Sequence, residues 1–294
     1  MSDRIVVGID GSKASARALN WAAAEAARTG HELVIINAIE IPTGADFYGV
    51  QLAGPEATAL QSYADELLAS AADRVKGQFP DLQVSTRSEI GSPTWVLSEA
   101  STDAAAIVVG SRGQGAFGRL VLGSVSTQLT TVARCPVFVL GEQDELPTTG
   151  PVVVGVDDSH FSIAALQFAI REAAARQVPV RVVSAFRTPA LAVPVEERLI
   201  LELRESEQAE AERVIKIALQ QARTDTELPE VDVEVVALEG APADVILEQS
   251  KDAQLIVVGS HGKGLVRRLV LGSVSRRVLL DADRPVALVD VPEE

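Results

Sequence analysis

Two glycine-rich segments carry the residues most suited to chemistry in this sequence. In the first segment, Gly110, Gly113 and Gly115 are followed by Gly123 and Ser124. Glycine permits positive φ and lets the backbone approach a ligand closely. A helix that begins directly after such a segment offers unpaired N–H groups and the positive end of its dipole to an anion. The segment therefore predicts a phosphate-binding loop.

The same spacing occurs again in the second half of the chain, where Gly259, Gly262 and Gly264 are followed by Gly272 and Ser273. The serines after each segment could add hydroxyl donors, and arginines at matching positions could add positive charge. These further candidates are Ser124, Ser126 and Arg119 in the first half, and Ser273, Ser275 and Arg268 in the second. Arg112 and His261 also match, and we interpret them as neighbours of a phosphate rather than as a shared catalytic group.

An aspartate follows the first apolar segment of each half. Asp10 and Asp157 could accept hydrogen bonds from ribose or adenine, and the alternative role of such a residue is to cap a helix or form a turn. Gly8 and Gly155 stand two residues earlier, where they would leave room for a ligand.

Several familiar motifs are absent from the sequence. No G-x4-G-K followed by Ser or Thr occurs, so the sequence does not support P-loop chemistry. The dinucleotide-binding fingerprint would place its glycines after the first strand, whereas here they follow the fourth. His31, His160 and His261 lack metal-ligand spacing, so no metal site is expected in the protein itself.

The two glycine-rich segments belong to a duplicated unit. Residues 107–126 and 256–275 are identical at 15 of 20 positions, at an offset of 149 residues. Residues 5–12 match residues 152–159 at an offset of 147. Such a period is too long for a solenoid and indicates a repeated domain. We expect domains at 1–142 and 151–294, with a linker over 143–150.

Apolar runs alternate with helical patterns in both domains. Strands are expected over 5–9, 33–39, 83–88, 105–110 and 137–140, and again over 152–156, 180–186, 231–238, 254–259 and 285–290. Helices are expected over 15–28 and 58–77, after Pro93, from Ser124, and over 196–223, whose charged face is expected in solvent. Trp21 and Trp95 are expected in the core.

This alternation predicts an α/β fold with an open five-stranded parallel sheet in each domain, Rossmann-like, with strand order 3-2-1-4-5. The chain then reverses its winding between strands 1 and 4, and a ligand is expected outside the carboxyl ends of those strands. The aspartates and the glycine-rich segments both follow these strands.

Charge and composition argue against nucleic acids and membranes as binding partners. Net charge is −15 over 294 residues, and such a field repels nucleic-acid phosphates, so no nucleic acid is expected as a partner. The single cysteine, Cys135, excludes an intrachain disulfide and suits a reducing compartment. No signal peptide and no apolar run near the roughly 20 residues of a membrane span are found. We expect a soluble, cytoplasmic protein without a membrane partner.

The order of these features resembles the ATP-binding subclass of the universal stress protein family. That subclass carries G-x2-G-x9-G followed by Ser or Thr, which is present twice without departure. The V-G-x-D start of each half also fits, as do Cys135-Pro136-Val137 and Arg284-Pro285-Val286 before the last strands. The resemblance covers essentially the whole chain.

The resemblance implies a role for each matching residue. Asp10 and Asp157 would contact ribose or adenine, and Ala38 and Ala185 would offer backbone contacts to adenine. The glycine loops would hold the phosphates together with Ser124-Val125-Ser126 in the first half and Ser273-Val274-Ser275 in the second. The implied cofactor is ATP, which can bring Mg²⁺ with it. Family members commonly pair through the fifth strand, which implies a homodimer or pairing of the two halves; the sequence names no other protein partner.

We therefore expect a stress-response regulatory protein that binds an adenine nucleotide in each domain. A slow ATPase stays open as an alternative, although no general base or P-loop lysine is evident. An interaction module with a purely structural nucleotide also stays open. A flavoprotein or adenylating enzyme would need a further motif, and none is found.

Overall fold

The computed structural model describes residues 3–40, 55–113, 122–141, 147–189, 196–262 and 271–291. The chain separates into two compact units, Met1–Glu142 and Gln143–Glu294. Among the helices of the described ranges, none is long and apolar enough to cross a membrane.

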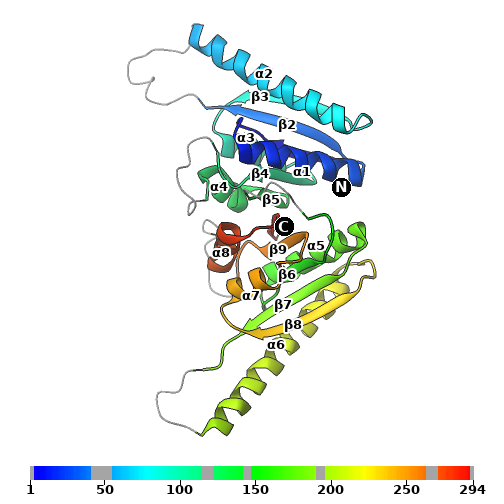
Figure 1. Cartoon of the computed structure of the whole chain (residues 1–294), viewed down its shortest axis with the longest axis vertical. Helices are drawn as coiled ribbons and strands as arrows, with labels where there is room; N and C mark the ends of the chain where they lie inside the picture. Colours follow the sequence, from blue (N-terminus) through cyan, green and yellow to red (C-terminus); the bar gives the residue numbers. More distant parts are fainter. Residues whose placement is uncertain are drawn as a thin grey trace. The chain divides into compact units, whose positions relative to one another are not determined.

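The first unit alternates strands and helices along the chain (Figure 1). In order, its elements are β1 (Arg4–Gly8), α1 (Lys13–Thr29), β2 (Glu32–Ile39), α2 (Pro55–Gln78), β3 (Val84–Ile90), α3 (Pro93–Ser101), β4 (Ala106–Gly110), α4 (Ser124–Val132) and β5 (Val137–Leu140). The strands are parallel and lie in the order β3-β2-β1-β4-β5.

The second unit repeats this arrangement. Its elements are β6 (Val152–Gly155), α5 (His160–Arg176), β7 (Val180–Phe186), α6 (Glu197–Asp225), β8 (Val233–Glu239), α7 (Pro242–Glu248), β9 (Leu255–Gly259), α8 (Ser273–Asp281) and β10 (Val286–Val289). Its parallel strands lie in the order β8-β7-β6-β9-β10. The predicted α/β class and the strand order 3-2-1-4-5 are confirmed in both units.

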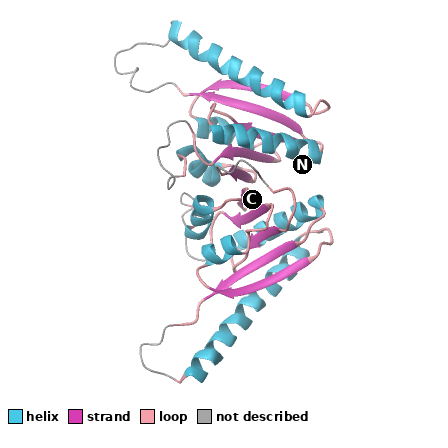
Figure 2. Cartoon of the chain, in the orientation of Figure 1, coloured by secondary structure: helices cyan, strands magenta, loops and turns pink. Residues whose placement is uncertain are grey.

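Helices pack on each sheet in pairs, as the helices and strands of Figure 2 show. In the first unit α1 contacts α2 and α3 contacts α4; in the second unit α5 contacts α6 and α7 contacts α8. Right-handed crossovers place the two pairs of a unit on opposite faces of its sheet. The central strands are therefore covered on both sides and consist of buried Val and Ile, such as Val6, Val7, Ile107 and Val108.

Most strand boundaries lie within a residue or two of the sequence prediction, whereas the helices extend further. The predicted helices 58–77 and 196–223 become Pro55–Gln78 and Glu197–Asp225. The prediction that Trp95 lies in the core was wrong, because its side chain is 57% exposed. The short helix α3 buries the next two residues, Val96 and Leu97, and so turns Trp95 outward.

A glycine at the end of each fourth strand makes the packing of the first helix possible. A Cβ on Gly110 would lie 2.7 Å from the backbone carbon of Ala14 in α1, and a Cβ on Gly259 would lie 2.9 Å from that of Phe161 in α5. The close approach at these two glycines is therefore between strand and helix backbone. Any side chain there would force the helix away from the sheet.

This contact predicts the effect of adding one methyl group. Gly110→Ala should lower the free energy of unfolding by about 1–3 kcal/mol, because it overpacks a backbone–backbone contact. Gly77→Ala in α2 is the matched control, since nothing lies within 4 Å of its Cβ position. The control should be as stable as the parent chain or more stable, since alanine favours helix. Denaturant unfolding of the two variants measures the difference, and equal stabilities would refute the packing role.

Candidate functional site

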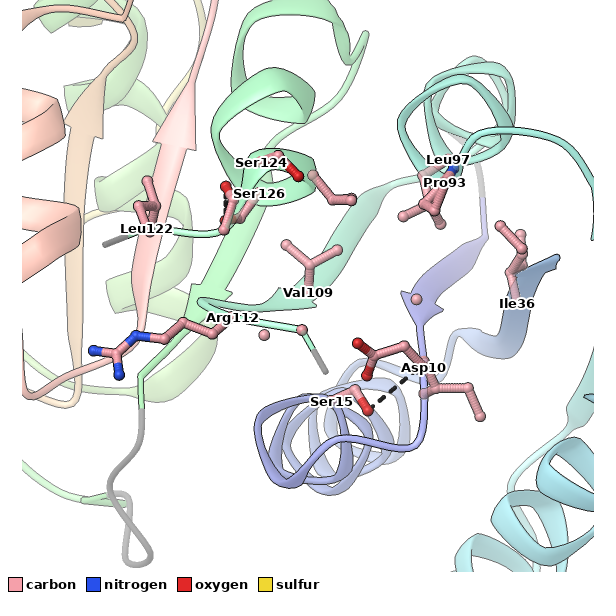
Figure 3. A pocket seen from close by; sticks show the side chains of 17 residues that line it. Asp10, Ser15, Ile36, Pro93, Leu97, Val109, Arg112, Leu122, Ser124 and Ser126 are labelled. Carbon is pink, nitrogen blue, oxygen red and sulfur yellow. Dashed lines mark hydrogen bonds between the residues drawn. The ribbon is translucent and has the colours of Figure 1, made fainter. Parts of the chain in front are cut away.

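A cavity of about 400 Å³ lies at the carboxyl ends of β1, β2 and β4 in the first unit. Every sequence candidate of this half that the structure describes lines it: Gly8, Asp10, Ala38, Gly110, Arg112, Gly113, Gly123, Ser124, Val125 and Ser126. Figure 3 shows Asp10 and Ser15 by α1, Ser124 and Ser126 on α4, and Leu97 and Pro93 on α3. Gly115 and Arg119 lie outside the described residues.

The second unit has an equivalent cavity of about 550 Å³ at the ends of β6, β7 and β9. Its described sequence candidates are again all in the lining: Gly155, Asp157, Ala185, Gly259, His261, Gly262, Gly272, Ser273, Val274 and Ser275. Gly264 and Arg268 lie outside the described residues. Both cavities stand where the winding of the chain reverses, which is the usual ligand site of such sheets.

The helix that begins at each cavity lacks a side-chain cap. The N-cap residues of α4 and α8 are Gly123 and Gly272, and neither provides a side-chain hydrogen bond to the first turn. In contrast, Ser12 and Ser159 cap α1 and α5 by accepting from Ser15 N and Ser162 N. Among the described residues, no side chain caps the first N–H groups of α4 and α8, which lie beside the cavities at the positive end of the helix dipole.

Two serine hydroxyls of these first turns are already used by the protein. Ser126 Oγ donates to Gly123 O at 3.0 Å, and Ser275 Oγ donates to Gly259 O at 2.6 Å. Both residues are buried. They consequently offer the cavity their backbone N–H rather than the hydroxyl donor that the sequence suggested, whereas no described residue bonds the hydroxyls of Ser124 and Ser273.

Each aspartate organises the turn after the first strand and also faces the glycine loop. Asp10 Oδ1 accepts from Ser12 N at 2.9 Å, and Asp157 Oδ1 accepts from Ser159 N at 3.0 Å. Their other oxygens lie against the loop glycines: a Cβ on Gly113 would be 2.6 Å from Asp10 Oδ2, and one on Gly262 would be 2.9 Å from Asp157 Oδ2. In each half, one carboxylate therefore both stabilises the turn and faces the glycine loop of the cavity.

Gly8 and Gly155 make room for a side chain rather than for a ligand directly. A Cβ on Gly8 would lie 2.9 Å from Leu97 Cδ1, and one on Gly155 would lie 2.5 Å from Ile246 Cδ1. Leu97 and Ile246 both line the cavities. The glycines let these apolar side chains form a wall of the site.

Neither this apolar wall nor the helix α6 was predicted from the sequence as part of a site. The wall includes Pro93, Leu97, Val109 and Leu122 in the first unit, and Pro242, Ile246 and Val258 in the second. Residues of α6 also line the second cavity: Glu207, Glu210, Ala211 and Val214. The charged face of α6 was expected in solvent; Glu210 is exposed as expected, whereas Glu207 is half-buried beside the cavity. Their spacing of three and four residues with Ala211 and Val214 was the available signal.

The two cavities therefore combine three chemical environments. Uncapped helix N–H groups suit an anion, a carboxylate suits hydroxyl or amino donors, and an apolar wall suits a flat or aliphatic group. A small organic anion with an uncharged ring and hydroxyl groups would match all three.

A scan of the sequence against family models matches the universal stress protein family at residues 1–141 and 148–290. A universal stress protein of Mycobacterium tuberculosis strain H37Rv is 34% identical over 290 residues, which cover 96% of this chain and 95% of the relative. A crystal structure of a universal stress protein from Archaeoglobus fulgidus superposes with a TM-score of 0.70 at 20% identity, covering 99% of this chain and 97% of that one. A universal stress protein solved in complex with cAMP covers 48% of this chain and 98% of its own, at 27% identity and a TM-score of 0.35.

The contact between Asp10 and Gly113 generates a prediction about coupling. Gly113→Ala should destabilise the protein because its Cβ would meet the Asp10 carboxylate. In an Asp10→Ala background the same substitution should cost less, by about 1 kcal/mol, because neighbouring residues are not additive. A double-mutant cycle of denaturant unfolding measures this coupling. Additive effects would show that the carboxylate does not hold this position in solution.

Proposed function

The chain belongs to the universal stress protein family, and from that premise we propose that each half binds one adenine nucleotide, ATP in particular, as a regulatory ligand in the stress response. The observation that carries the proposal is the pair of uncapped helix N-termini at α4 and α8, each lining a cavity at the winding reversal. A helix N-terminus of this kind is a ready anion site, and it suits a phosphate group.

The phosphates would lie against the backbone N–H groups of Ser124, Val125 and Ser126 in the first half. Ser273, Val274 and Ser275 would act in the same way in the second half. The hydroxyls of Ser124 and Ser273 are the side-chain donors of these turns that no described residue engages. Gly113 and Gly262 would let the phosphates approach the loop backbone, since glycine has no Cβ to exclude them.

The nucleoside would occupy the rest of each cavity. Asp10 and Asp157 present an oxygen toward the cavity side of the glycine loop and would accept from ribose hydroxyls. Ala38 in β2 and Ala185 in β7 line the cavities, and adenine would contact the backbone there. Leu97 and Ile246 would form the apolar wall beside the nucleoside. Cavities of about 400 and 550 Å³ are of the usual size for small-molecule sites.

The proposal assigns Mg²⁺ as a companion of ATP and gives it no protein ligand. In nucleotide sites Mg²⁺ keeps most of its ligands as water and phosphate oxygens. The proposal also places the protein in the cytoplasm, which the single cysteine suits, and includes pairing of these domains as a homodimer or within one chain.

The placement of the phosphates predicts the outcome of two substitutions. Gly123→Glu and Gly272→Glu put a carboxylate at the N-terminus of α4 or α8, where it would satisfy the free N–H groups and repel phosphate. Each should remove one of two ATP sites, with an affinity loss of about 100-fold or more, since like charges in a desolvated site cost several kcal/mol. Isothermal titration calorimetry gives the number of sites and their dissociation constants.

Gly123→Ala and Gly272→Ala are the matched controls, because they add the same Cβ without a charge. That Cβ would lie 3.2 Å from Ser111 O in the first half and 3.3 Å from Ser260 O in the second, so a small adjustment accommodates it. The alanine variants should keep both sites. If the double glutamate variant still bound two ATP molecules with parental affinity, the phosphates would lie elsewhere.

We also propose binding without fast turnover. Fast phosphoryl transfer needs groups that orient the attacking water and stabilise the charge that develops in the transition state. The N–H groups named above can bind phosphate oxygens, but as donors they cannot accept a proton from an attacking water. ATP hydrolysis should therefore be well below about 1 per second, at the slow limit of ordinary enzymes. Chromatography of nucleotides after incubation measures the rate; a rate near 10 per second that the double glutamate variant lacks would make the protein an enzyme.

A further inference from the structure

The second cavity contains a buried histidine where the first contains an arginine. Ser111 N donates to Leu140 O at 2.8 Å, and Ser260 N donates to Val289 O at 2.9 Å, so the two loops leave their sheets in the same register. The next residues are Arg112 and His261. His261 is only 5% exposed and lines the cavity. Arg112 is half-buried, and Figure 3 shows its side chain extending away from Asp10 and Val109.

A hydrogen-bonded relay indicates which nitrogen of His261 carries a proton. Ser260 Oγ donates to Asp290 Oδ1 at 2.9 Å and lies 3.0 Å from His261 Nδ1. Because an ionised carboxylate only accepts, the one hydroxyl proton of Ser260 is directed to Asp290. The oxygen of Ser260 can then only accept from His261, so Nδ1 bears the hydrogen.

The other ring nitrogen, Nε2, is buried and has no hydrogen-bond partner among the described residues. With Nδ1 protonated, Nε2 is an acceptor in the neutral ring and becomes a donor only when the ring takes up a second proton. Phosphate oxygens that carry negative charge are acceptors. A phosphate can therefore engage Nε2 only when the imidazole is positively charged.

The first half has neither part of this relay. Gly141 follows β5 where Asp290 follows β10, and glycine offers no carboxylate to Ser111. The residue in the place of His261 is Arg112, and an arginine guanidinium is a cation throughout the physiological pH range. The relay and the histidine thus occur together in one half and are absent together from the other.

Building on the proposed function, we infer that His261 is a proton-dependent phosphate ligand of the second site. When a nucleotide binds at the second site, Nε2 of His261 takes up a proton, so the affinity of this site falls as pH rises. The first site has Arg112 at this position and lacks this cause of pH dependence. Histidine is the side chain whose charge ordinarily changes between about pH 5 and 8.

The charged groups around His261 also favour phosphate binding by the protonated ring. Asp157 lies against Gly262, the residue that follows His261, and Asp290 is linked through Ser260. From α5 the ring faces Phe161, whose centroid is 5.1 Å away and which carries no charge. Among the described residues, the remaining charged side chains of the cavity lining are Arg187, Glu207 and Glu210. Carboxylates outnumber cations among these described side chains, so a proton on His261 would offset their repulsion of a phosphate.

The test compares the two sites in otherwise identical chains. Gly123→Glu leaves the second site, and Gly272→Glu leaves the first. Dissociation constants for ATP are measured by calorimetry between about pH 5.5 and 8. From the lowest to the highest pH, the dissociation constant of the second site divided by that of the first should rise about tenfold or more. One coupled proton changes affinity by up to tenfold per pH unit. Protonation of ATP itself is common to both sites and cancels in the ratio.

His261→Arg in the second-site chain should remove this rise, because a permanent cation replaces the titrating one, and His261→Gln should remove it while weakening binding at low pH. Equal pH dependence of the two sites, or a dependence that survives in His261→Arg, would overturn the inference and leave the proposed function standing. Failure of both sites to bind ATP at any pH would overturn both.

A second measurement does not depend on the glutamate variants. The unmodified chain has three histidines, so its imidazole nitrogens can be followed by NMR, with His261→Gln giving the assignment. Without nucleotide, Nδ1 should carry the hydrogen; saturating ATP should move the change in protonation at Nε2 to higher pH. A ring protonated first at Nε2, or a titration that ATP leaves unchanged, would also overturn the inference.

Discussion

In each half, the helices that follow the two central strands leave in opposite directions, because the chain winds one way from β1 to β2 and the other way from β4 to β5. Backbone cannot fill the space that this reversal leaves at the carboxyl ends of the strands. The same reversal brings the start of α4 opposite the turn that Asp10 organises, and the second half repeats the arrangement with α8 and Asp157. The remaining features of both sites depend on how closely these parts approach one another.

Glycine controls that approach in more than one way. At Gly110 and Gly259 the missing side chain lets a strand end meet the backbone of the first helix. At Gly113 and Gly262 it lets the loop come up to a carboxylate, and only at Gly123 and Gly272 does it leave a helix start uncapped beside a cavity. The glycine spacing is therefore as much a packing requirement as a binding one. This also explains why the pattern is found in both halves although the linings of the two cavities differ.

Sequence reasoning went furthest where local chemistry determines structure. The alternation of apolar runs and helical patterns predicted the fold class and strand order, because buried parallel strands must be apolar on both faces. The spacing of glycines and aspartates named residues that the structure brings to one cavity in each half. What it could not find comes from contacts between distant elements. Leu97 and Ile246 belong to helices with no motif, and Ser260 and Asp290 are 30 residues apart in the chain. Trp95 shows a further limit, since a single aromatic residue in a short helix does not reveal which face is buried.

The account stands on the claim that phosphates rest on the helix starts of α4 and α8. A crystal structure of the unmodified chain grown with ATP tests this most directly. It should show one nucleotide in each half, with phosphate oxygens against the N–H groups of Ser124–Ser126 and Ser273–Ser275 and adenine beside Ala38 and Ala185. Nucleotide bound at another surface, or both cavities without nucleotide at saturating ATP, would contradict the account.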